Sequence, residues 1–235
     1  MEKARVLIRD GRKIAEEMVL HRPDRWKALL DGMGVSAGGG GPESLLASIR
    51  LFGHGPGARN APFSEVDLAR ALQGGSGPLL SAPKAWKRRR LRRVLILLQE
   101  EGSRRSEGPE IPKGGIPGLD LSVLSLHRGL PGEWGAWIGK GRRRSAEKAL
   151  KRVLAARLRT WAGSREGVVP LGVLVGRPGV RLRDRVRQAR PDLVLLGGDP
   201  GDVHFLRRTA ARAVRCPCPV LIHLRPRKRG QDSGS

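Results

Sequence analysis

The chain has 235 residues, and 46 lysines and arginines against 22 aspartates and glutamates give it a net charge of +24. Hydrophobic residues make up 39% of it, which is enough for a core and excludes wholesale disorder. The 3% of aromatic residues exclude a base-stacking platform for single strands, and two cysteines exclude a disulfide scaffold. No apolar run approaches the roughly 20 residues of a membrane span. These features predict a cationic cytoplasmic protein.

The positive charge is concentrated in the second part of the chain. Residues 1–81 carry a net charge of +2, whereas residues 82–235 carry +22. Such asymmetry indicates two regions with different partners, and it predicts non-specific attraction to nucleic acid at low salt. The abundance of Arg, Gly, Ala and Pro also fits the composition that a GC-rich coding sequence yields.

The N-terminal region is expected to be small and mainly helical. Its predicted elements are one short strand and three helices, at residues 5–8, 23–33, 42–51 and 64–74. Each helix has apolar residues at helical spacing, and a proline or a capping serine opens the second and the third. The region spans residues 1–81, and the densest basic run follows it as a linker over residues 82–92.

Beyond this linker, short apolar runs alternate with helical patterns. The predicted strands are 94–98, 119–126, 168–175, 192–197 and 220–224. The predicted helices are 145–163, opened by Ser145 as a cap, 181–190 and 204–215. Residues 100–118 and the tail 226–235 are expected to be unstructured. This alternation is typical of an α/β fold built from βαβ units around a mainly parallel sheet.

Three motifs in residues 93–225 carry a family resemblance. Gly176-x-Pro178 is followed after thirteen residues by Asp192-Leu-Val-Leu-Leu-Gly197, and Cys218-Pro-Val-Leu-Ile222 comes last. In these residues the chain resembles the universal stress protein family. The resemblance implies a Rossmann-like, doubly wound sheet of five parallel strands in the order 3-2-1-4-5. Ligands of such a sheet bind outside the carboxyl ends of its strands.

Many members of that family bind ATP through a glycine-rich loop after the fourth strand. The residues that the resemblance places at this nucleotide site are Gly176, Gly197, Gly198, Gly201, Glu101 and Arg207. The interval from Gly197 to Cys218 is about four residues shorter than in the family, so that Leu206-Arg207 stands where the family has a Gly-Ser step. The loop is therefore expected to be altered or lost; Arg207 could contact an anion through its guanidinium group, or belong to a solvated helix face.

No other residues form a convincing catalytic or metal-binding set. The five histidines are scattered along the sequence, and Cys216 and Cys218 lack the spacing and partners of a metal motif. Cys218 is expected to be a buried structural residue. The sequence therefore predicts a protein that is not an enzyme, with no metal and no required cofactor.

The first functional hypothesis is a non-catalytic regulatory or stress-response module related to the universal stress proteins. We expect a regulatory protein partner and a homodimer formed through residues 220–224, as is common in that family. Two alternatives remain open. One is an ATP-binding universal stress protein, and the other is a basic nucleic-acid-binding protein in which residues 42–98 form three helices of a winged-helix-like module.

Overall fold

The computed structural model describes residues 13–14, 16–35, 41–53, 77–82, 91–100, 111–127, 129, 139–176, 180–198, 210, 213 and 218–224. Its helices are α2 (Pro23–Gly32), α3 (Pro42–Ser48), α6 (Lys140–Gly163) and α7 (Val180–Ala189). Its strands are β1 (Arg50–Gly53), β2 (Leu79–Ala82), β3 (Arg93–Glu100), β4 (Asp120–His127), β5 (Val168–Val175), β6 (Leu193–Gly198) and β7 (Val220–Leu224). The fold is α/β, and none of the helices described is long and apolar enough to cross a membrane.

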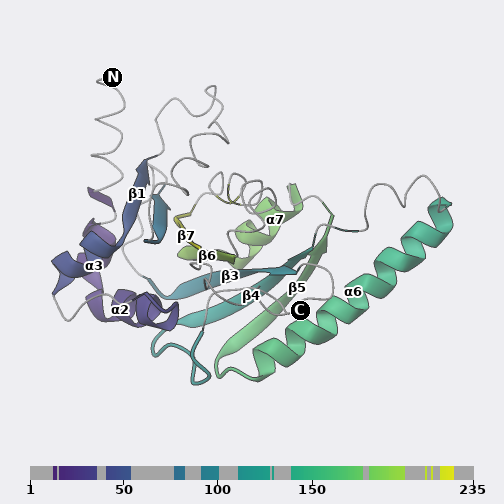
Figure 1. Cartoon of the computed structure of the whole chain (residues 1–235), viewed down its shortest axis with the longest axis horizontal. Helices are drawn as coiled ribbons and strands as arrows, with labels where there is room; N and C mark the ends of the chain where they lie inside the picture. Colours follow the sequence, from purple (N-terminus) through teal and green to yellow (C-terminus); the bar gives the residue numbers. More distant parts are fainter. Residues whose placement is uncertain are drawn as a thin grey trace, which may run out of the picture.

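All seven strands form one sheet, in the order β1-β2-β7-β6-β3-β4-β5 (Figure 1). Every neighbouring pair is parallel except β2 and β7, which are antiparallel. The predicted five-stranded parallel sheet of order 3-2-1-4-5 is therefore matched only in part. Strands β3–β7 lie side by side as β5-β4-β3-β6-β7, and β1 and β2 extend the sheet beyond β7.

The central strands are buried on both faces, as is usual for parallel strands whose crossover helices cover the sheet. Val94–Leu98 in β3 and Leu193–Leu196 in β6 are continuous apolar runs with at most 1% exposure. Side chains of β3 alternate between two cores. Val94, Ile96 and Leu98 pack on the face covered by α2 and α6, whereas Leu95 and Leu97 pack on the face covered by α7.

Helix α6 packs only its second half against the sheet. Leu154, Leu158 and Ala162 are buried, whereas most of residues 141–153 are exposed. Its first turns extend beyond the carboxyl ends of the strands (Figure 1). The prediction that Ser145 caps this helix is wrong, because the helix begins at Lys140. Arginine has a high helix propensity, so the arginines at positions 142–144 extend the helix on the N-terminal side of Ser145.

The carboxyl end of α6 is fixed by Arg165. Its guanidinium group lies 3.9 Å from the centre of the Trp161 ring, and its Nη1 donates to the Trp161 carbonyl at 2.8 Å. Burial lowers the pKa of Arg165 below its ordinary value. This contact ends the helix where the chain turns back into β5.

The structure differs from two further predictions. Residues 111–119 are packed rather than unstructured, since Ile111 and Ile116 are each 5% exposed. Residues 93–100 are a central strand and residues 50–53 and 79–82 are also strands, so the three-helix winged-helix arrangement over 42–98 is wrong. Local periodicity could not separate these cases, because Val94, Leu95 and Leu98 fit a helix as well as a strand.

The expected dimer through residues 220–224 is not supported. Strand β7 is not an edge strand, because β6 pairs with one side of it and β2 with the other. Leu79 lies opposite Ile222, and Ser81 lies opposite Val220. A second copy would have to displace β2 before it could pair with β7.

Several predictions fall on residues outside the described part. These are the strand at 5–8, the helix at 64–74, most of the linker at 82–92 and the tail at 226–235. Of the helix at 204–215, only Ala210 and Ala213 are described; both are helical and fully buried. The division at residue 81 stays a prediction, although β2 crosses it and shares the sheet with β3–β7.

Candidate functional site

The predicted nucleotide-site residues are only partly brought together. Gly197 and Gly198 end β6, and Gly176 directly follows β5. All three lie at the carboxyl edge of the sheet, by which we mean the carboxyl ends of its parallel strands. Two strands, β3 and β4, lie between β6 and β5, so these glycines stand about 14 Å apart. Glu101, Gly201 and Arg207 lie outside the described residues.

Gly176 has a structural role in its own turn. Its φ of +98° is one that side chains disfavour, and its N–H donates to the His127 carbonyl at 2.9 Å. A Cβ added to Gly129 would stand 3.3 Å from the Gly176 Cα. The missing side chain of Gly129 therefore lets the segment after β4 approach Gly176 closely, whereas Gly176 itself is required by its φ, since a Cβ there would meet open space.

Buried polar side chains gather at the carboxyl edge. Six polar or charged residues are buried within the described part of the chain, and four of them lie in the carboxyl-terminal halves of parallel strands: Gln99, Ser125, His127 and His223. Their exposures are between 0% and 9%. Sequence reasoning missed all four as a group. The available signal was a polar residue that interrupts an apolar strand near its end, as in Leu97-Leu98-Gln99.

Gln99 and Ser125 each have an unpartnered polar atom, and strand alternation places the two side chains on opposite faces of the sheet. Gln99 is 3% exposed and Ser125 is 0% exposed, yet the Gln99 Nε2 and the Ser125 Oγ make no hydrogen bond. Buried polar groups are normally hydrogen-bonded, and an orphaned one costs about 1–3 kcal/mol. The two atoms are therefore candidates for contact with a ligand or an ordered water.

The neighbourhood of Gln99 contains a glycine on the adjacent strand. Leu97 pairs with Leu196 in the β3–β6 ladder. Continuing this register by two residues places Gln99 beside Gly198. By strand alternation, the Gln99 side chain lies on the α7 face of the sheet, as those of Leu95 and Leu97 do. Gly198 has no side chain, so the Gln99 amide has no side-chain neighbour at the paired position of β6.

A hydrogen bond orients one of the two histidines at this edge. The Nδ1 of His127 accepts a hydrogen bond from the Gly129 N–H at 2.9 Å. In the neutral ring, the proton is then on Nε2. His223 lies opposite Gly197 in the β6–β7 ladder. Both imidazoles thus stand beside glycines where parallel strands end.

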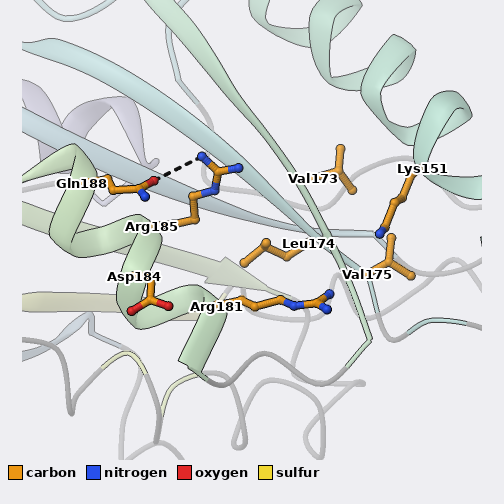
Figure 2. Close-up of a pocket in the computed structure, with 8 residues that line it drawn as sticks. All are labelled: Lys151, Val173, Leu174, Val175, Arg181, Asp184, Arg185 and Gln188. Atoms are coloured by element: carbon orange, nitrogen blue, oxygen red, sulfur yellow. Dashed lines mark hydrogen bonds between the residues drawn. The ribbon is translucent and has the colours of Figure 1, made fainter. Parts of the chain in front are cut away.

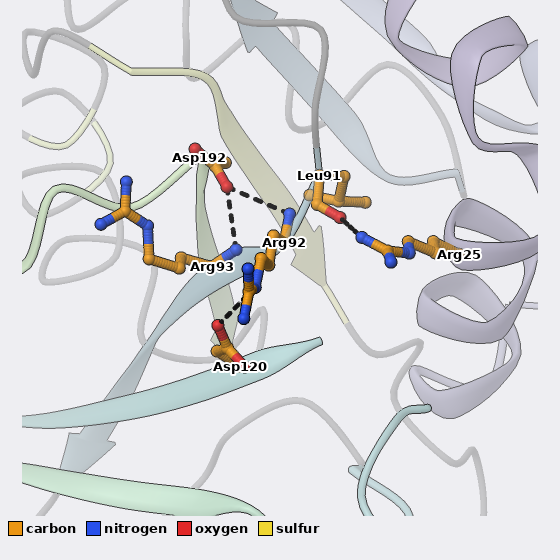
Figure 3. Close-up of polar contacts among 6 residues, drawn as sticks. All are labelled: Arg25, Leu91, Arg92, Arg93, Asp120 and Asp192. Atoms are coloured by element: carbon orange, nitrogen blue, oxygen red, sulfur yellow. Dashed lines mark hydrogen bonds and ion pairs between the residues drawn. The ribbon is translucent and has the colours of Figure 1, made fainter. Parts of the chain in front are cut away.

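At the opposite edge of the sheet, where the parallel strands begin, the Asp192 carboxylate is hydrogen-bonded to the backbone (Figure 3). We call this the amino edge. The Oδ2 of Asp192 accepts hydrogen bonds from the Arg92 N–H at 3.0 Å and the Arg93 N–H at 2.9 Å. The Asp192 N–H donates to the Arg93 carbonyl at 2.7 Å. Asp192 opens the Asp-Leu-Val-Leu-Leu-Gly motif, and its place in the fold is to tie β3 to β6 at their amino ends.

Further contacts complete the amino edge. Arg92 pairs with Asp120 at 3.1 Å, and Arg25 of α2 donates to the Leu91 carbonyl at 2.7 Å (Figure 3). In contrast, no group of three or more His, Cys, Asp or Glu side chains within the described residues could hold a metal ion. Cys218 is 3% exposed in the core on the α7 face, as predicted for a structural residue.

A cationic hollow lies at the outer edge of β5 (Figure 2). It has a volume of about 370 Å³, and its wall is formed by Val173–Val175. Lys151 reaches it from α6, and Arg181 and Arg185 reach it from α7. Sequence reasoning did not single out these three cations. Only the position of β5 between the two helices brings them together.

Comparison of the chain with protein-family models gave no match, and comparison with curated proteins gave none. The functional assignment therefore rests on the residues and the geometry described above.

Proposed function

We propose that this protein is a non-catalytic regulatory module related to the universal stress proteins, with its ligand position at the carboxyl edge between β3 and β6. The observation that carries this proposal is the Gln99 side chain of β3, which is buried at that edge, lies beside Gly198 of β6 and has an Nε2 with no hydrogen-bond partner. In doubly wound sheets, ligands bind at the point where the strand order reverses, and β3 and β6 are the two strands that meet there.

The chemistry of this edge supports binding rather than reaction. On the α7 face Gln99 offers a neutral amide, whereas by strand alternation Ser125, His127 and His223 lie on the opposite face of the sheet. Asp192 is the buried carboxylate of the described residues, and it is engaged with the backbone at the other end of the sheet. The ligand that fits best is a small polar molecule, whose occupancy would signal to a protein partner in the cytoplasm.

ATP binding is the second candidate, and the glycine pair favours it. Gly197 and Gly198 stand at the carboxyl end of β6, where backbone N–H groups can approach a phosphate. The family resemblance adds Gly201, Arg207 and Glu101 to this cradle. The shortened interval before Cys218 weighs against a complete triphosphate site.

Thermal unfolding with millimolar Mg-ATP or tripolyphosphate separates the two candidates. A ligand that binds the folded state stabilises it by RT ln(1 + [L]/Kd), about 2.7 kcal/mol at a hundredfold excess over Kd. For the regulatory module we expect ATP and tripolyphosphate to raise Tm equally, and only at low salt, through the basic surface. A rise specific to ATP that persists at about 150 mM salt and is lost in Gly198→Val would establish the ATP-binding alternative instead.

A further inference from the structure

The outer edge of β5 lies apart from the ligand position proposed between β3 and β6. β5 is the last strand of the sheet, and no described strand pairs with its outer side. Helix α6 covers one face beside it and α7 covers the other. The cationic hollow described above lies along this edge, between the two helices (Figure 2).

The two halves of β5 differ in their ability to pair. The first half contains Pro170, which has no N–H to donate, and a bulge, since Val123 pairs with Pro170 but Leu124 pairs with Gly172. Proline and bulges are devices that prevent an edge strand from pairing. Val173–Val175 contain neither device, and they form the wall of the hollow.

The backbone of this second half presents hydrogen-bonding groups outward. The Gly176 N–H points to β4, because it donates to the His127 carbonyl at 2.9 Å. In a trans peptide the preceding carbonyl points the opposite way, so the Val175 carbonyl faces outward. By strand alternation, the N–H and C=O of Val173 also face outward.

The charges around this edge lie on both faces of the sheet. Lys151 of α6 stands on one side, and Arg181 and Arg185 of α7 stand on the other (Figure 2). No ion pair joins these three cations to a carboxylate anywhere in the described residues; Arg185 donates only to the Gln188 side chain, at 3.3 Å. Asp184 is the one carboxylate of the hollow.

We propose that Val173–Val175 bind an extended acidic peptide segment as an added strand, whose neighbouring acidic side chains reach Lys151 on one face and Arg181 and Arg185 on the other. Side chains of an added strand alternate between the two faces. Two adjacent acidic residues would thus meet cations from both helices, while the backbone pairs with β5. A second copy of this chain is a poor occupant, because α6 alone carries nine cations against one glutamate.

The test uses the full-length protein and a fluorescent nine-residue peptide, in which valines and threonines flank two adjacent glutamates. Binding is measured by fluorescence anisotropy at about 150 mM salt. Arg181→Ser with Arg185→Ser is expected to raise Kd about tenfold. The matched control, Arg183→Ser with Arg187→Ser, removes the same charge from the same exposed helix but not from the hollow. It is expected to change Kd less than about twofold.

A second peptide separates strand addition from charge attraction. It keeps both glutamates but carries N-methyl groups on alternate backbone nitrogens of the edge that would pair with β5, and we expect its binding to be lost. Equal weakening by the two double variants, undiminished binding of the N-methylated peptide, or no peptide binding at all would each overturn the proposal. Duplex DNA that binds more tightly than the peptide, and is released by the hollow variant, would also overturn it and identify nucleic acid as the partner.

Discussion

The amino and carboxyl edges of the sheet differ in how completely their buried polar groups are hydrogen-bonded. At the amino edge, one carboxylate oxygen of Asp192 accepts hydrogen bonds from two backbone N–H groups, and the Arg25 side chain donates one to the Leu91 carbonyl. At the carboxyl edge, Gln99 and Ser125 are as deeply buried but keep unpartnered atoms. Because an unsatisfied buried group costs stability, the first edge holds the fold together and the second retains groups that stability alone would not select.

The largest effect is expected from Asp192→Ala at the amino edge. The substitution leaves the Arg92 and Arg93 N–H groups without their charged acceptor, so the free energy of unfolding should fall by about 3 kcal/mol. Urea denaturation measures this change. Asp120→Ala is the control, because its ion pair with Arg92 is exposed and should contribute less than about 1 kcal/mol. Similar losses in the two variants would contradict the special role of Asp192.

A second test of the amino edge compares two adjacent glycines before β4. Gly115 has a φ of +68°, and a Cβ there would stand 2.5 Å from the Glu166 carbonyl oxygen. Gly115→Ala should therefore lower the free energy of unfolding by about 2 kcal/mol. Gly114 has open space at its Cβ position, so Gly114→Ala should stay within about 0.5 kcal/mol of the parent. Chemical denaturation of both variants checks this, and the same small change in both would show that the packing at Glu166 is loose.

The smallest effect, and one of opposite sign, is expected at the carboxyl edge. Gln99→Leu replaces an unsatisfied buried amide by an apolar side chain of similar size, so the ligand-free protein should gain about 1 kcal/mol. Ser125→Ala should gain less, because it removes a single hydroxyl. Their Tm and urea midpoints measure both gains. A loss of stability in Gln99→Leu would mean that this amide has a structural partner, and the contrast between the edges would not hold.

The candidate site was only partly accessible to sequence reasoning. The resemblance to universal stress proteins directed attention to Gly197 and Gly198, which end β6, and to Gly176, which follows β5 at the same edge of the sheet. It could not show that two strands separate Gly176 from that pair, because strand order is not a local property. Gln99 was missed for a related reason. A glutamine that ends an apolar run is unremarkable until the adjacent strand is known to present a glycine.

The sequence by itself determined the strands after residue 92 and the starts of two helices before it. Apolar runs of strand length predicted β3–β7 to within about two residues, and prolines at the first turn marked the starts of α2 and α3. These features depend on periodicity within a few neighbouring residues, which the sequence displays directly. Tertiary structure decided which strands lie next to each other. Leu79 pairs with Ile222, which is far from it in the sequence. This pairing of β2 with β7 covers the edge of β7, whereas the outer edge of β5 stays open among the described strands. Pairing over such separations depends on the packing of whole layers, so only the folded chain decides which edge remains available to a partner.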